Sequence, residues 1–136
     1  MTQRVFLDAN VLFSAAWTAG AGLARLWNLR GVMLVTSRHA VAEAERNLDS
    51  DAQRARLQGL IAGMAFIEAP PEAVLPAGVE LVAKDAPILL AAIEAHATHL
   101  LTGDRRHFGH LYGISIKSGR ILTPASYLNS YDAETK

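Results

Sequence analysis

The sequence has no cysteine and no excess charge of either sign, because 13 Lys and Arg residues balance 13 Asp and Glu residues. The missing cysteines exclude disulfides and zinc sites built from thiolates. The balanced charge excludes a partner held by a global positive field, so a polyanion such as nucleic acid would need a local basic patch or a bound cation.

The first residues, MTQRVFLDAN, lack a signal-peptide pattern, and no apolar run reaches the roughly 18 residues that a membrane span needs. We therefore expect a cytoplasmic protein with no membrane partner. Internal repeats and low-complexity segments are also missing. The chain does have 136 residues with a hydrophobic share of 51%, which predicts a single domain, 1–136, with a substantial core.

Short apolar runs alternate along the chain with stretches of helical periodicity. The runs predict strands at 5–7, 32–35, 66–67, 99–102 and within 114–122. The helical patterns predict helices at 10–17, 23–29, 38–48, 53–63, 86–97 and from Pro124, with a helical turn at 78–83. The segment 69–78 contains three of the five prolines, and we expect it to be the main connecting loop.

Strands that alternate with helices predict βαβ units. The fold class is therefore α/β, with a mostly parallel sheet of four to five strands flanked by helices on both faces. In such a sheet, ligands bind at the carboxyl ends of the strands. The residues that follow the predicted strands are the first candidates for a functional site.

Acidic residues follow these strand ends. Asp8 closes the first strand and Asp104 lies just past the fourth, so both are expected at the same edge. Asp85 opens the helix that leads into the fourth strand, so that helix begins at this edge too. Glu43 lies in the second turn of the helix after the second strand, and its side chain leans back toward the edge. Glu45 is the rival candidate, because periodicity does not separate the two and Glu43 is only about 3 Å nearer.

Each of these acids also has a purely structural interpretation. Asp8, Asp85 and Asp104 are all suitable helix N-caps, and Glu43 could be a solvated helix residue. Their coincidence at one edge is harder to explain in this way, because crowded carboxylates repel one another unless a cation neutralises them. Oxygen ligands select hard ions, so the sequence predicts Mg²⁺ or Mn²⁺ and metal-assisted phosphodiester hydrolysis.

Four blocks of sequence resemble the PIN-domain family. They are LDANVL at 7–12, SRHAVAE at 37–43, KDAPILLAAIEAHATHLLTGDRRHF at 84–108 and ILTPASYL at 121–128. The resemblance implies a PIN-like fold and a Mg²⁺- or Mn²⁺-dependent ribonuclease. Many single-domain members are similar to VapC-like toxins of toxin-antitoxin pairs, so it also implies an RNA substrate, a cognate antitoxin partner and a homodimer.

The resemblance also assigns roles to residues. The family's acidic quartet matches Asp8, Glu43, Asp85 and Asp104. Its spacing from serine to glutamate places Glu43 rather than Glu45 in the site. Asn10 and Thr102 match polar positions that support the metal site and orient water in the catalytic centre.

Basic residues and histidines near the last aspartate have less definite roles. Some relatives have a further acid where this chain has Arg105 and Arg106, which leaves the number of metal ions open. With Arg38, these arginines are expected near the carboxylates, where phosphate contacts and solvated ion pairs explain them equally well. Assistance in the chemistry is one interpretation of His107 and His110, but neither has the spacing of a metal-binding histidine pair, so a role without function is favoured.

Two functions fit these features. The first is a Mg²⁺- or Mn²⁺-dependent endoribonuclease, the toxin of a toxin-antitoxin pair; the second is a PIN-fold protein that binds RNA or acts as a scaffold without turnover. The complete set of four acids favours the enzyme. A phosphate-accepting receiver or a phosphatase fits poorly, since a single Asp ends the first strand and no G-x-G-x-x-G loop is present.

Overall fold

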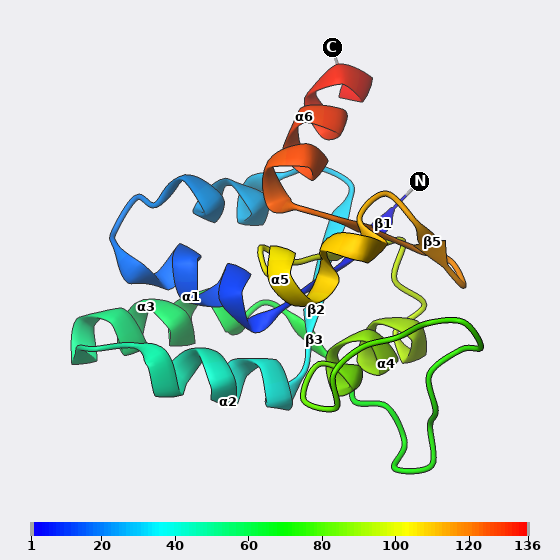
Figure 1. Ribbon diagram of the computed structural model, residues 1–136. Coiled ribbons are helices and arrows are strands. Elements are labelled where there is room, and N and C mark those ends of the chain that lie inside the picture. Colours follow the sequence, from blue (N-terminus) through cyan, green and yellow to red (C-terminus); the bar gives the residue numbers. More distant parts are fainter. Residues whose placement is uncertain (1, 136) are drawn as a thin grey trace.

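The computed structural model describes residues 2–135, and over this range the chain forms one six-stranded sheet with the order β3-β2-β1-β4-β6-β5 (Figure 1). The strands are β1 (Gln3–Leu7), β2 (Val32–Thr36), β3 (Ala65–Phe66), β4 (His99–Leu101), β5 (Ser115–Ile116) and β6 (Gly119–Leu122). Neighbouring strands are parallel from β3 to β6, and β5 pairs with β6 in antiparallel fashion. The prediction of a mostly parallel sheet is confirmed.

The sheet has one strand more than the four to five predicted. The extra strand arises because the segment 114–122, expected to hold a single strand, folds into the hairpin of β5 and β6. Lys117 adopts a φ of 57°, which allows the chain to reverse over two residues between these strands. Alternation of apolar and polar residues does not reveal such a reversal when the turn lacks a glycine at the critical position.

The helices are α1 (Ala9–Trp17), α2 (Arg38–Asn47), α3 (Asp51–Ile61), α4 (Ala86–Glu94), α5 (Arg105–Phe108) and α6 (Pro124–Thr135), with 3₁₀ helices η1 (Gly22–Asn28) and η2 (Gly109–Leu111). In Figure 1, α1, α2 and α3 lie on one side of the sheet and α4 lies on the other. Both faces are therefore covered, as predicted for βαβ connections.

Three predicted helices differ from the structure. The segment 23–29 forms the 3₁₀ helix η1, and Ala24 N donates to Ala21 O at 3.0 Å, a bond between residues three apart. The segment 78–83 is not helical. The helix expected to reach residue 97 ends at Glu94, because His96 takes a φ of 53° and terminates it.

The core is built around the central strands. Val5, Phe6 and Leu7 of β1 are fully buried, and Leu100 and Leu101 of the adjacent β4 are buried as well. Consecutive buried residues are expected for a parallel strand that has helices on both of its faces. The carboxyl ends of both strands are fixed by this packing, and the candidate site residues Asp8 and Thr102 follow directly from them. None of the helices in residues 2–135 is both long and apolar enough to cross a membrane.

His96 offers a test of the helix-terminating geometry. A left-handed conformation costs an L-residue roughly 1–2 kcal/mol, whereas glycine adopts it freely. Glycine also increases the conformational entropy of the unfolded chain, which offsets part of this gain. We therefore expect His96→Gly to raise the free energy of unfolding, measured by urea denaturation, by about 0.5–1 kcal/mol.

The matched control is Ala95→Gly at the preceding, right-handed residue. This substitution relieves no strain and removes a buried methyl group, so it should lower stability. Loss of stability in His96→Gly as well would contradict the assigned geometry.

Candidate metal centre

The site lies where two neighbouring strands end. Leu7 of β1 is paired with Leu101 of β4 in parallel register, and Asp8 N donates to Leu101 O at 3.1 Å. Asp8 therefore lies beside the turn that begins at Thr102 and leads to Asp104. The topological prediction that the ends of the first and fourth strands meet is confirmed.

Asp8 is buried and accepts hydrogen bonds on both carboxylate oxygens. Oδ1 accepts from Ala9 N at 2.6 Å, which caps the start of α1. Oδ2 accepts from the Thr102 hydroxyl at 2.8 Å and from Asn10 Nδ2 at 3.0 Å. The carboxylate is thus fixed in orientation by groups from two separate parts of the chain.

Asn10 and Thr102 also hold the turn after β4. Asn10 Oδ1 accepts from Gly103 N at 2.6 Å, and the Thr102 hydroxyl oxygen accepts from Asp104 N at 3.1 Å. Asn10 Nδ2 lies 3.2 Å from the same hydroxyl oxygen. These two polar residues join Asp8 and Asp104 into one hydrogen-bonded unit. The supporting role that the family resemblance assigns to them stays a prediction.

Burial raises the pKa of Asp8 from 3.8 to about 6. The hydrogen bonds from Thr102 and Ala9 oppose this shift, whereas the carboxylates of Glu43 and Asp85 add to it by repulsion. The charges of these acids therefore act on one another. A cation placed among them would reverse the repulsion and favour the ionised form of each.

Asp85, Asp104 and His107 form the closest cluster. His107 Nδ1 lies 2.9 Å from Asp85 Oδ2 and 2.9 Å from Asp104 Oδ2. Even so, neither His107 Nδ1 nor Asp85 Oδ2 has a hydrogen-bond partner among residues 2–135, although both atoms are buried. Buried polar atoms without partners are costly, so this pair has the character of a site that a ligand completes.

The helix-cap interpretation holds for two of the three aspartates. Asp8 caps α1, and Asp104 Oδ1 accepts from His107 N at 3.1 Å at the start of α5. Asp85 precedes α4, but within the described chain its side chain makes no capping hydrogen bond. Helix capping therefore does not account for the buried carboxylate of Asp85, whose other oxygen, Oδ1, lies 3.8 Å from Lys84 Nζ.

The donor set of this cluster fits a divalent ion. One carboxylate oxygen from each of Asp85 and Asp104 and one ring nitrogen of His107 lie within 4.8 Å of one another, the one such group of three found in residues 2–135. Adjacent ligands at about 2.1 Å from an octahedral ion lie about 3 Å apart. The two separations of 2.9 Å agree with that spacing.

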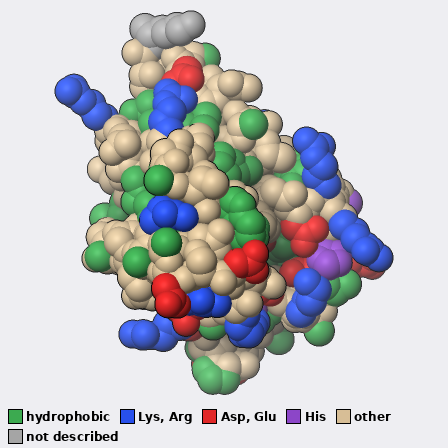
Figure 2. All heavy atoms as spheres, turned by 90° about the vertical axis from the view of Figure 1, so that its left-hand side faces the viewer, with side chains coloured by type: hydrophobic (Ala, Val, Ile, Leu, Met, Phe, Trp, Pro, Cys, Tyr) green, Lys and Arg blue, Asp and Glu red, His purple; other side chains and the backbone are tan. Residues whose placement is uncertain are grey.

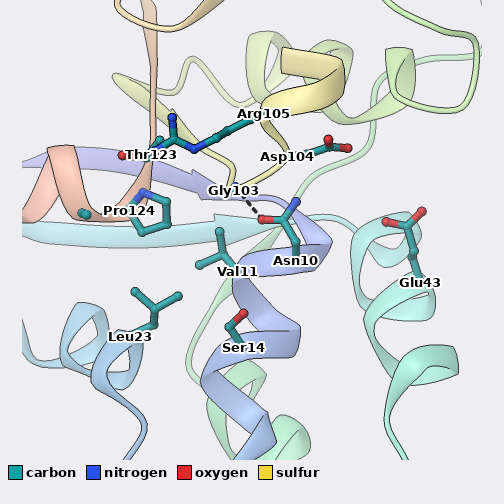
Figure 3. A pocket seen from close by; sticks show the side chains of 11 residues that line it. Asn10, Val11, Ser14, Leu23, Glu43, Gly103, Asp104, Arg105, Thr123 and Pro124 are labelled. Carbon is teal, nitrogen blue, oxygen red and sulfur yellow. Dashed lines mark hydrogen bonds between the residues drawn. The ribbon is translucent and has the colours of Figure 1, made fainter. Parts of the chain in front are cut away.

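Glu43 lies across a cleft from this cluster. The cleft, of about 560 Å³, is lined by Glu43, Asn10, Asp104 and Arg105 among others. Figure 3 shows the carboxylates of Glu43 and Asp104 at the same end of it, while Arg105 points toward the other end. Glu45, the rival, is exposed and accepts a long hydrogen bond of 3.5 Å from Gln58 on α3.

The four predicted acids are therefore only partly brought together. Asp85 and Asp104 share the close cluster, whereas Asp8 and Glu43 lie outside it but near enough for Glu43 to influence the pKa of Asp8. His107 is the member that sequence reasoning missed, because only pairs of histidines were considered. The available signal was the spacing Asp104-x-x-His107, which places both side chains on one face of a helical turn.

The basic residues are divided between two surfaces. Arg105 lines the cleft, whereas Arg106 lines a second groove with His107 and His110. The guanidinium of Arg38 lies 5.7 Å from the centre of the Phe66 ring. In Figure 2, acidic side chains and a histidine lie together at the edge of a hollow, with basic side chains around them. The site thus combines local positive and negative charge in a chain of zero net charge.

A comparison with known families identifies the class of protein. The family model of the PIN domain matches residues 4–106. The chain belongs to the PIN-domain family, whose members are generally metal-dependent nucleases, and the mostly parallel sheet with flanking helices is a PIN-like fold. A comparison with curated proteins gave no match.

The raised pKa of Asp8 predicts how stability depends on pH in metal-free buffer. The folded protein holds the Asp8 proton more tightly than the unfolded chain, whose Asp pKa is near 3.9. As the pH rises from about 4 to about 6, ionisation of Asp8 progressively lowers the free energy of unfolding, by roughly 2–3 kcal/mol in total. Above this window the loss of stability stays constant.

The measurement is urea denaturation of the wild type and Asp8→Asn in EDTA at several pH values. Asn cannot ionise, although it forfeits about 1 kcal/mol by losing one of the hydrogen bonds to Asp8 Oδ2. The wild type should lose stability relative to the variant as the pH rises through the window. A pH-independent difference would contradict the raised pKa.

Proposed function

We propose that the protein is a Mg²⁺- or Mn²⁺-dependent endoribonuclease that hydrolyses RNA phosphodiester bonds. The observation that carries this proposal is the buried Asp85 Oδ2, which lies without a hydrogen-bond partner in residues 2–135 beside Asp104. In the proposal the metal is held by the four acids Asp8, Glu43, Asp85 and Asp104. Membership of a family of metal-dependent nucleases supports the reaction class.

Each side chain has a distinct task in this proposal. A divalent ion bound here supplies polarisation of the scissile phosphate and activation of the attacking water. Asp8 is held in orientation by Thr102 and Asn10, so its carboxylate needs no rearrangement to act. Glu43 is partly buried and faces the cleft, where its carboxylate can accept the proton released by the attacking water.

The cleft beside the acids is the proposed RNA site. Its volume of about 560 Å³ lies within the range of ligand pockets, and its lining is mixed, with Val11, Leu23 and Pro124 beside polar groups. Arg105 supplies a positive charge in the same cleft, toward the end opposite the carboxylates, where it is suited to a phosphate of the RNA backbone. In this proposal the apolar residues contact the bases and Arg105 contacts a phosphate. RNA binding then does not require a net positive charge on the protein.

The toxin role is a further part of the proposal. Its support is the resemblance of the four sequence blocks to single-domain toxin ribonucleases, which also implies a cognate antitoxin and a homodimer. A toxin ribonuclease must be inhibited in the cell, and an antitoxin that covers the cleft would exclude RNA from the metal centre.

Cleavage of RNA in Mn²⁺ tests the reaction and its residues. We expect Asp8→Asn, Asp85→Asn, Asp104→Asn and Glu43→Gln each to lower the cleavage rate by roughly 10²- to 10⁴-fold, because each removes a charge or a proton acceptor. The matched control is Glu45→Gln, on the same helix but outside the cleft. It should cleave at the wild-type rate.

Two results would count against this assignment. Equal activity of the Glu43 and Glu45 variants would remove Glu43 from the site. Specific RNA binding by a wild-type protein that shows no cleavage in either metal would favour the alternative, a PIN-fold RNA-binding or scaffolding protein without turnover.

Growth assays test the toxin role separately. Expression of the chain alone in a bacterial host should arrest growth, and Asp104→Asn expressed to the same level should not, because the arrest depends on RNA cleavage. Active enzyme in vitro without any growth arrest would separate the ribonuclease from the toxin.

A further inference from the structure

We propose that His107 is a ligand of the metal, through Nδ1, and that this nitrogen makes the site prefer Mn²⁺ over Mg²⁺. The inference rests on the proposed function, since it concerns the same centre. It goes beyond the four-acid site because it adds a ligand of a different chemical class.

The position of His107 Nδ1 carries the argument. The atom lies 2.9 Å from one oxygen of Asp85 and 2.9 Å from one oxygen of Asp104, the separation expected of neighbouring ligands around one ion. Asp85 is at least nine-tenths buried, and its Oδ2 has no hydrogen-bond partner in the described part of the chain. A cation shared by the three atoms would satisfy all of them.

A simple ion pair between histidine and aspartate does not account for the arrangement. A ring nitrogen carries at most one proton, directed in the plane of the imidazole, so it can donate well to only one carboxylate. Here two carboxylates approach the same nitrogen, and for residues 2–135 Nδ1 makes no hydrogen bond with acceptable geometry. A lone pair directed at a shared ion explains both approaches at once.

The surrounding structure holds His107 in this position. Asp104 uses Oδ1 to accept from His107 N at 3.1 Å, and its Oδ2 faces the ring. Phe108, the next residue, is fully buried and anchors the short helix α5 in the core. The imidazole is therefore presented to the carboxylates by a fixed backbone, and binding of an ion would require little rearrangement.

The nitrogen ligand determines the preference between ions. Mg²⁺ strongly favours oxygen ligands and retains several waters, whereas Mn²⁺ accepts carboxylate and imidazole together. Removal of the imidazole should therefore weaken Mn²⁺ binding more than Mg²⁺ binding. This differential effect is one that a merely structural role of His107 would not produce.

The test uses Mn²⁺ itself as the probe, without RNA. Electron spin-echo spectroscopy of the Mn²⁺-loaded protein should show a histidine nitrogen coupling that changes when the histidines carry ¹⁵N. The coupling should be present in the wild type and in His110→Ala, and absent in His107→Ala and His107→Gln. His110 is the matched control, since it lines the second groove together with His107 but lies outside the cluster of Asp85, Asp104 and His107, and its Nε2 lies 2.8 Å from Glu80 O.

Calorimetric titration gives the second readout. We expect the Mn²⁺ dissociation constant to rise about 10- to 100-fold in His107→Ala and His107→Gln, and the Mg²⁺ constant to change by less than about threefold. Circular dichroism identifies any variant that fails to fold, and the isotope experiment on the wild type needs no variant.

The outcomes separate the inference from the proposed function. No nitrogen coupling in the Mn²⁺-loaded wild type, or a coupling that persists in both His107 variants, would overturn the role of His107 even if RNA cleavage depends on the four acids. Failure of the wild type to bind Mn²⁺ or Mg²⁺ at all would overturn the metal centre itself.

Discussion

The hydrogen bond from the Thr102 hydroxyl to Asp8 Oδ2 is the interaction on which the site depends. It joins residues 94 positions apart, across the ends of two parallel neighbouring strands, and the same hydroxyl oxygen accepts from Asp104 N. Because β1 and β4 are buried on both faces, their ends cannot shift independently. The turn that carries Asp104 and then His107 is therefore fixed relative to Asp8, and with it one side of the proposed metal centre.

This arrangement concentrates negative charge where water is largely excluded. Burial and repulsion by Glu43 and Asp85 raise the pKa of Asp8, and Asp85 Oδ2 lies unsatisfied in the described chain. A raised carboxyl pKa and an unsatisfied buried oxygen both lower the free energy of unfolding, and such features are found mainly at functional sites. At such a site, a bound ligand supplies the missing interactions. An ion that binds the folded state stabilises it by mass action, so metal binding and folding are coupled in this account.

The sequence was sufficient to predict the sheet and the edge where Asp8 and Asp104 meet, because strand ends in a parallel sheet share one side. It was not sufficient for the hairpin around Lys117, whose positive φ has no glycine to mark it. Periodicity could not separate Glu43 from Glu45. The family resemblance favoured Glu43 by its spacing from the serine, and the contacts of α2 with the cleft and with α3 distinguish the two residues in space. His107 was missed because only pairs of histidines were considered. Its spacing to Asp104 is visible in the sequence, whereas the approach of Asp85 from a distant segment is not encoded by residue spacing.

Anomalous diffraction at the manganese absorption edge, from crystals grown with Mn²⁺, tests the central claim most directly. The account predicts a peak within about 2.0–2.3 Å of Asp85 Oδ2 and Asp104 Oδ2, at the carboxyl edge of β1 and β4. Mn²⁺ bound elsewhere on the molecule, with these two carboxylates left unliganded, would contradict it.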